Sequence, residues 1–275
     1  MTSDFKIGFE IEMVLKNSYI QSLESDYILK RQNGEYSEDK ARKAFRSDLK
    51  AFLPKKFKDT KLIVVDDGSV ATWSKSFACP VELITPPMPA HEAKELLAWI
   101  FAFMASKPIE TNYTTGLHVN VSYADKKLTR QVLTAALLTE LDQKKLLAKY
   151  GRLANEYCRP NPRRVETREV LRRIDKTSDA VQIMQDLEES VMYVCEDKYH
   201  AVNINHMDSK NQYIEFRMIG NKNYHRKYLS VVRDIDTMLT AVRRSTLPSA
   251  LGQMPSEEIK PLADKVMRKL RIAAR

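Results

Sequence analysis

The chain has 275 residues, of which 43% are hydrophobic; this suffices for one domain with a full core and excludes a chain that is disordered throughout. No apolar run reaches the roughly 20 residues of a membrane-spanning helix, and the first residues lack the apolar stretch of a signal peptide. Three widely spaced cysteines exclude a disulfide framework and favour the cytoplasm, while a net charge of +9 attracts polyanions.

Hydrophobic periodicity predicts strands interleaved with helices. Strands are expected near residues 5–16, 61–66, 69–74, 79–85, 115–123, 199–206 and 212–219. Helices are expected near residues 38–51, 89–106, 127–149, 179–195, 224–246 and 257–272. This order indicates an α+β fold in a single domain over residues 1–275, with a basic helical extension from about residue 247.

The first expected strand carries two acids one residue apart, Glu10 and Glu12. Successive strand residues point to opposite faces, so these two acids share one face and the apolar residues around them share the other. Like charges on one face repel each other, and a divalent cation between them would remove the repulsion. The alternative is a half-exposed strand with two solvated glutamates, which this pair alone favours.

Four later segments repeat the pattern of polar residues set into apolar strands. One acid, Glu82, stands inside the apolar run at 79–85, which a double proline ends. Three other strands each align polar side chains on one face, namely His118, Asn120 and Ser122, then Asn203 and Asn205, then Glu215 and Arg217. Packed together, these strands would form one apolar face for helices and one face with four acids, a histidine, an arginine and amides.

The polar face is typical of a metal site for phosphate chemistry. Carboxylate oxygens suit hard cations such as Mg²⁺ or Mn²⁺, whereas a structural zinc site would need four cysteine or histidine ligands at short spacings. Arg217 beside Glu215 suits a cation aimed at a phosphoryl oxygen. Taken singly, His118 fits a hydrogen-bonded strand histidine and Glu215 with Arg217 fits a surface ion pair. Their joint occurrence favours a site.

These segments carry a resemblance to a known family. The chain resembles the amidoligases, small members of the glutamine synthetase and glutamate–cysteine ligase group of carboxylate–amine ligases. The resemblance is carried by five segments in the family's order, namely Gly8-Phe9-Glu10-Ile11-Glu12, Asp67-Gly68-Ser69, Val81-Glu82-Leu83-Ile84-Thr85-Pro86-Pro87, Gly116-Leu117-His118-Val119-Asn120-Val121, and Asn203 through Ile214-Glu215-Phe216-Arg217. They span most of residues 5–225, while residues 125–195 and the tail after 240 carry no matching motif.

The resemblance implies a fold and a reaction. The fold would be a mainly antiparallel curved sheet with helices on its convex face, as in the catalytic domain of glutamine synthetase. ATP and Mg²⁺ or Mn²⁺ would bind on the concave face. The γ-phosphate would pass to a substrate carboxylate to give an acyl phosphate, which an amine then attacks to form an amide or isopeptide bond. The substrates would be small-molecule or peptide carboxylates and amines.

The resemblance also implies roles for single residues. The residues that match the metal ligands are Glu10, Glu12, Glu82, His118 and Glu215. Arg217 matches the arginine that stabilises the transferred phosphate, and Asn203 with Arg217 is expected to contact the nucleotide. Asp67 resembles a carboxylate that holds or deprotonates the amine, although in glutamine synthetase the similar Asp-Gly-Ser precedes the paired acids. Ser69 is expected to support the turn.

A second function class stays open at this point. A non-catalytic nucleic-acid-associated protein on the same fold would account for the basic surplus, which includes the loop at 159–173 and the basic C-terminus. That loop would either close over a nucleotide or form a solvated surface. Phosphagen kinases share this sheet, but their phosphate-clamping arginines are not recognised here.

A ligase needs its acids to converge on one metal shell, whereas in a nucleic-acid-binding protein they could diverge. Some ligases of this group occur in phage genomes, so a phage-encoded enzyme would act in the host cytoplasm.

Overall fold

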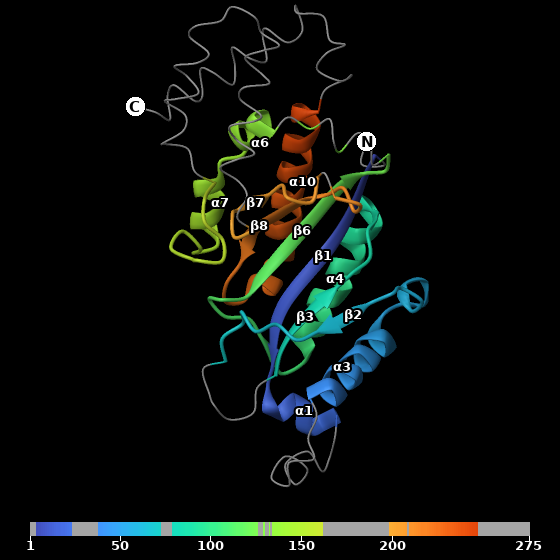
Figure 1. The fold of residues 1–275 in the computed structure, drawn as a ribbon. Helices are drawn as coiled ribbons and strands as arrows, with labels where there is room; N and C mark the ends of the chain where they lie inside the picture. Colours follow the sequence, from blue (N-terminus) through green and yellow to red (C-terminus); the bar gives the residue numbers. More distant parts are fainter. Residues whose placement is uncertain are drawn as a thin grey trace, which may run out of the picture.

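The computed structural model describes residues 4–23, 38–72, 79–125, 129, 132, 134–161, 198–207 and 209–246. The described strands are β1 (Phe5–Leu15), β2 (Ile63–Val65), β3 (Cys79–Ile84), β4 (Met88–Pro89), β5 (Ile109–Glu110), β6 (Gly116–Tyr123), β7 (Val202–Asn203) and β8 (Ile214–Gly220) (Figure 1). The described helices are α1 (Asn17–Leu23), α3 (Glu38–Phe52), α4 (Ala90–Ser106), α6 (Thr134–Glu140), α7 (Gln143–Lys149) and α10 (Tyr228–Ser245), with 3-10 turns at Lys55–Phe57 and Tyr224–Arg226.

Within the described residues, the strands form one eight-stranded antiparallel sheet, which confirms the α+β class. The order is β2-β3-β1-β6-β8-β7, and the short strands β4 and β5 also pair with the long central strand β1. The register brings polar residues together across neighbouring strands: Glu10 opposite His118, Glu12 opposite Glu82, and both Asn120 and Asn203 opposite Glu215. Segments that are far apart in sequence therefore contribute to one row of side chains.

One face of the sheet is apolar, and α4 and α10 cover it (Figure 1). The alternate residues of β1 that point to this face are completely buried: Phe5, Ile7, Phe9, Ile11 and Met13. From α4, Leu96, Leu97, Ile100, Phe101 and Met104 join the same core, and α10 adds Val231, Ile235, Met238 and Val242. Truncating a buried phenylalanine in such a core costs about 3–5 kcal/mol. This apolar face holds the sheet, so the opposite face can carry charge.

Two expected elements are shorter or divided, for local reasons. The helix expected near 127–149 is divided into α6 and α7, because the Asp142 carboxylate accepts a hydrogen bond from Lys145 N (3.1 Å) and caps a new helix. The strand expected near 199–206 is limited to β7, since the Asn203 side chain accepts a hydrogen bond from Asn205 N (3.1 Å) and turns the chain.

The strand expected near 69–74 does not form at residues 69–72. Asp67 Oδ1 accepts hydrogen bonds from the Ser69 backbone N (2.9 Å) and hydroxyl (2.7 Å), which bends the chain there. Ala71 N then donates to Thr114 Oγ1 (2.9 Å) and joins no strand ladder. Ser69 thus supports the turn as expected, and the turn is pinned to the loop before β6.

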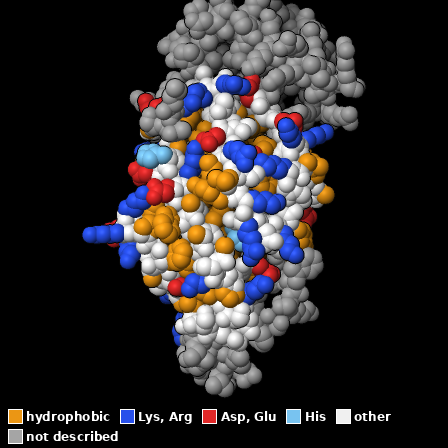
Figure 2. All heavy atoms as spheres, turned by 180° about the vertical axis from the view of Figure 1, so that it is seen from behind, with side chains coloured by type: hydrophobic (Ala, Val, Ile, Leu, Met, Phe, Trp, Pro, Cys, Tyr) orange, Lys and Arg blue, Asp and Glu red, His pale blue; other side chains and the backbone are white. Residues whose placement is uncertain are grey.

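Several expectations fall outside the described residues. These are the helices near 179–195 and 257–272, the basic extension from about 247, and the basic loop from residue 162 onward. Among the helices that the structure does describe, none combines the length and the apolar character needed to cross a bilayer. The helix-covered side shows Lys and Arg side chains interspersed with hydrophobic and acidic ones (Figure 2).

Candidate functional site

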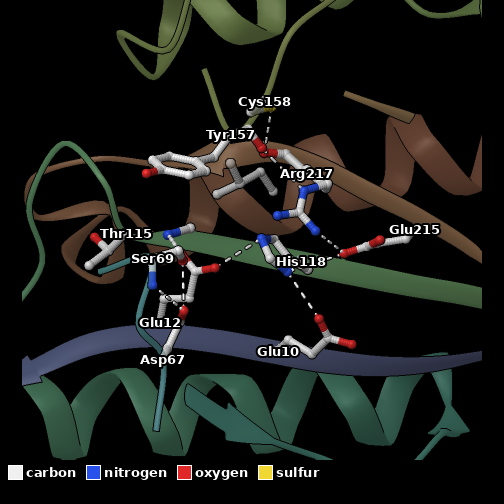
Figure 3. Close-up of polar contacts among 12 residues, drawn as sticks. Glu10, Glu12, Asp67, Ser69, Thr115, His118, Tyr157, Cys158, Glu215 and Arg217 are labelled. Atoms are coloured by element: carbon white, nitrogen blue, oxygen red, sulfur yellow. Dashed lines mark hydrogen bonds and ion pairs between the residues drawn. The ribbon is translucent and has the colours of Figure 1, made fainter. Parts of the chain in front are cut away.

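The imidazole of His118 is the centre of the polar face (Figure 3). Its Nδ1 lies 3.0 Å from Glu10 Oε2 and 3.2 Å from Glu215 Oε1, and its Nε2 lies 3.2 Å from Glu12 Oε1. The histidine side chain is only 3% exposed, and those of Glu12 and Glu215 are 5% and 4% exposed. Strands β1, β6 and β8 thus bring three carboxylates from distant segments onto one buried ring.

Amide and guanidinium groups fix two of these carboxylates. Asn120 Nδ2 donates to Glu10 Oε1 (2.8 Å), and Asn203 Nδ2 donates to Glu215 Oε2 (2.6 Å). Arg217 Nη1 donates to the other oxygen of Glu215 (2.7 Å). The guanidinium is itself anchored, because Arg217 Nε donates to the Tyr157 carbonyl (3.3 Å). Both carboxylates are therefore held in one orientation before any ligand arrives.

A second group of acidic side chains lies next to the carboxylates around His118, on the side of the loop at 66–72. Glu12, Asp67 and Glu82 each offer an oxygen, and these atoms lie within 4.8 Å of one another. Ligand atoms of Glu10, Glu82 and His118 form another such group within 4.8 Å, so Glu82 is shared by the two. The geometry places two cation-sized groups of donors side by side on the face.

The first residue of β6 holds the Glu12 carboxylate in place. Its Oε2 accepts a hydrogen bond from Gly116 N (2.5 Å), and the Tyr224 hydroxyl donates to the carbonyls of Glu12 (2.9 Å) and Gly116 (3.1 Å). A Cβ on Gly116 would lie 3.2 Å from both Glu12 Oε2 and His118 Nε2. Only a residue without a side chain leaves room for these groups, which explains the glycine.

A buried cation, Arg152, also lies next to Gly116. It is 1% exposed, and its Nη1 donates to the carbonyls of Thr115 (2.8 Å) and Ile219 (3.3 Å). A Cβ on Gly220 would lie 1.7 Å from this nitrogen, so that glycine makes space for the guanidinium. Burial raises the pKa of Glu12, and the charges of His118 and Arg152 oppose the rise. Arg152 therefore favours the ionised form of Glu12.

The carboxylates differ strongly in their electrostatic environments. Burial favours the neutral form of Glu10, but the hydrogen bond and charge of His118 outweigh it and lower the pKa of Glu10 to about 2. Burial and the charge of Glu10 raise the pKa of Glu82 to about 8. Burial and Arg217 lower the pKa of His118, but Glu12, Glu10 and Glu215 outweigh them and raise it. These surroundings favour the neutral form of Glu82 and the protonated form of His118.

This arrangement fits a hard divalent cation. Two buried carboxylates, Glu12 and Glu215, and two partly buried ones, Glu10 and Glu82, crowd together, which is costly unless positive charge lies between them. The donors are oxygens with a single imidazole, as Mg²⁺ or Mn²⁺ prefers. His118 Nε2 is buried, and its partner among the described residues is Glu12 Oε1 at 3.2 Å, so both ring nitrogens face carboxylates. A divalent cation among these carboxylates would reduce their mutual repulsion.

Every residue that the sequence indicated for the site lies on this face or at its edge. Glu10, Glu12, Glu82, His118, Glu215, Arg217, Asn203 and Asp67 are all within the cluster or in contact with one of its members. Tyr213 precedes Glu215 by two residues and so shares its face. Burial, and then the charges of Glu10, Glu215 and Glu82, raise the pKa of this tyrosine.

The sequence reasoning missed groups that reach the site from loops. Arg152 follows α7 without any motif, so no periodic signal could have found it. Cys158 lies in no motif either, and its buried thiol donates to the Arg217 carbonyl (2.9 Å). Asn120 shares the strand parity of His118, and that alternation was a sufficient signal for its place beside Glu10.

Comparison with protein-family models matches residues 3–231 to the family described as "Putative amidoligase enzyme". The chain belongs to this amidoligase family. The match covers all eight described strands and every site residue named above, so the acidic face lies within the region that the amidoligase family model describes. Comparison with curated proteins gave no match. Membership supports a ligase, and the acidic cluster adds residues that can bind a metal.

Proposed function

We propose that this amidoligase joins a carboxylate to an amine in a reaction that consumes ATP and requires Mg²⁺ or Mn²⁺. A carboxylate is a poor electrophile at neutral pH. In the first step a carboxylate oxygen attacks the γ-phosphorus and ADP leaves, which gives an acyl phosphate. In the second step the amine nitrogen attacks the acyl carbon, inorganic phosphate leaves, and an amide or isopeptide bond results. The convergence of four glutamates on His118 beside Arg217 is the observation that supports this most.

Under this proposal Glu10, Glu82, His118 and Glu215 hold the cation next to the phosphates, and Glu12 with Glu82 completes the neighbouring group. When bound, the cation neutralises charge between the nucleotide and the attacking carboxylate, which would otherwise repel each other. Asn120 orients Glu10 for this task. The buried Arg152 favours the charged, ligating form of Glu12.

Arg217 is the candidate for stabilising the transferred phosphoryl group. Glu215 and the Tyr157 carbonyl hold its Nη1 and Nε, and the close-up shows the guanidinium turned toward the cluster (Figure 3). A planar guanidinium fixed in this way can present its remaining N–H groups to phosphoryl oxygens. Asn203 uses its amide on Glu215 and its oxygen on Asn205 N, so we propose that it assists the nucleotide by orienting Glu215.

Asp67 is the candidate for handling the amine. Its Oδ1 is used by Ser69, and it lies with Glu12 and Glu82 at the end of the cluster away from Glu215. Negative charge there would attract a protonated amine, and the carboxylate could take the proton that the amine loses during attack. The proposal thus places the amine at the Asp67 end. It also equates the sheet with the curved catalytic sheet of glutamine synthetase, with the site on its concave face.

The proposal is tested by ADP release with Mg²⁺, measured against pooled amino acids and polyamines. We expect release with the wild type and a loss of at least about 100-fold in Glu215→Gln and Glu12→Gln, because each change removes an anionic ligand and no core area. Glu92→Gln on the exposed start of α4 is the matched control, with activity unchanged. Full activity in both site variants would reject the site. Absent ADP release together with tight, salt-sensitive DNA binding would favour the nucleic-acid alternative.

A further inference from the structure

The polar face continues beyond the acidic cluster toward one end of β1. In the register of β1 with β6, Gly8 lies opposite Asn120 and Lys6 lies opposite Ser122. Both pairs share the face of Glu10, because Gly8 and Lys6 precede it by two and four residues along the strand. At about 3.3 Å per residue, Lys6 lies about 13 Å from Glu10. We call this stretch of the polar face, from Glu10 to Lys6, the track.

A tyrosine stands at the same end of the sheet. Tyr213 directly precedes β8 and lies two residues before Glu215, so it is in step with the residues of β8 that face the site. Val121 of β6 is opposite Ile214, which brings Tyr213 beside the last pairs of this track. The side chain thus lies at the edge of the cluster, on the side opposite to Asp67.

The Tyr213 ring is already half of an aromatic stack. The ring of His206 lies parallel to it, with centroids 4.4 Å apart and an interplanar angle of 16°. Backbone contact supports the pair, because Tyr213 N donates to the His206 carbonyl (3.3 Å). Both side chains are half-buried. The stack fixes one face of the tyrosine and leaves the ring oriented before binding.

Backbone closes the opposite side of the track. Residues 85–87 pass so close to Gly8 that a Cβ there would lie 3.3 Å from the Thr85 carbonyl oxygen. The track is therefore floored by the small or amide side chains of Gly8, Asn120 and Ser122, with backbone on one side and an aromatic ring on the other.

We propose that Tyr213, backed by His206, stacks on the base of the nucleoside triphosphate, which lies along the track with its phosphates at the Glu10 end. This inference rests on the proposed function, and it adds the direction in which the nucleotide lies. Stacking on an aromatic ring is available to any base, because every base has a π face. The carboxylate and amine then enter from the opposite end, where Glu12 and Asp67 lie.

Equilibrium binding separates the base from the phosphates. Calorimetry with Mg²⁺ compares a non-hydrolysable ATP analogue with tripolyphosphate, which has no base. For Tyr213→Ala we expect about tenfold weaker binding of the analogue and unchanged binding of tripolyphosphate. Tyr213→Phe keeps the ring and should bind the analogue within about twofold of wild type. His206→Ala should weaken it by a few fold. Tyr113→Ala, which removes a tyrosine that is 51% exposed, is the control and should bind like wild type.

Each outcome is informative once circular dichroism shows that the variants are folded. Wild-type affinity for the analogue in Tyr213→Ala would overturn the stacking assignment and leave the proposed function standing. Equal losses in Tyr213→Ala and Tyr213→Phe, for tripolyphosphate as well, would also overturn it, because the hydroxyl would then contact phosphate. If wild-type protein binds neither ligand with Mg²⁺, the proposed function itself fails.

Discussion

Replacing Gly116 with alanine places a methyl group against three buried side chains of the site, Glu12, His118 and Arg152. The new Cβ would lie 3.0 Å from Arg152 Nη1 and 3.2 Å from both Glu12 Oε2 and His118 Nε2. These contacts are tighter than nine in ten real Cβ contacts, and each neighbour is buried and held by partners of its own. Over-filling such a site costs about 1–3 kcal/mol. Displacing Glu12 and His118 would also weaken cation binding by at least about tenfold.

Urea unfolding and Mn²⁺ titration measure both effects of Gly116→Ala. The control is Gly68→Ala, because a Cβ at Gly68 would meet nothing within 4 Å. We expect the control to keep wild-type cation affinity and to lose no stability, since alanine in open space restricts the unfolded chain at least as much as glycine does. The reasoning is refuted if Gly116→Ala retains both the stability and the cation affinity of the wild type.

Three further predictions address single groups. Arg217→Lys should lower ADP release by at least about tenfold with unchanged Mn²⁺ binding, because an ammonium cannot reproduce a planar contact to phosphate; a fully active variant would remove Arg217 from its role. Asp67→Asn should slow aminolysis more than acyl-phosphate formation when hydroxylamine traps the intermediate, and equal losses in both steps would reject the amine role. Burial, with a smaller effect of Arg226, lowers the pKa of His225 to about 4. The unfolded histidine binds a proton near pH 6.5, so unfolding free energy should fall between pH 6.5 and 4 by about 2–3 kcal/mol more in wild type than in His225→Gln; parallel pH profiles would contradict this.

Strand parity made much of the candidate site predictable. Glu10, Glu12, His118, Glu215 and Arg217 sit in alternating segments, and alternation alone decides which face each side chain takes. The same alternation defines the apolar face that packs on α4 and α10. Alternation gives the face of each side chain, but the pairing of the strands decides which side chains meet. Before the structure, only the resemblance to ligases indicated that these residues form one cluster.

Other features of the fold and the site depend on single contacts that no hydrophobic periodicity in the sequence indicates. Arg152 reaches the site from a loop, and its partners are backbone carbonyls, which any sequence has. The break between α6 and α7 rests on one cap by Asp142, and the turn at Asp67 and Ser69 replaces a strand that composition favoured. Short-range hydrogen bonds from side chains to the backbone thus decide where these helices and strands end. Secondary-structure propensity alone does not include such bonds.

Direct titration of Mn²⁺ or Mg²⁺ onto the protein tests the central claim that these carboxylates form one cation site. The wild type should bind the cation with a defined stoichiometry. Glu10→Gln and Glu215→Gln should each lose at least about tenfold in affinity, because each change removes an anionic oxygen ligand; circular dichroism in the absence of cation checks that both variants are folded. A wild type that binds no divalent cation, or variants that bind as tightly as it does, would contradict the account.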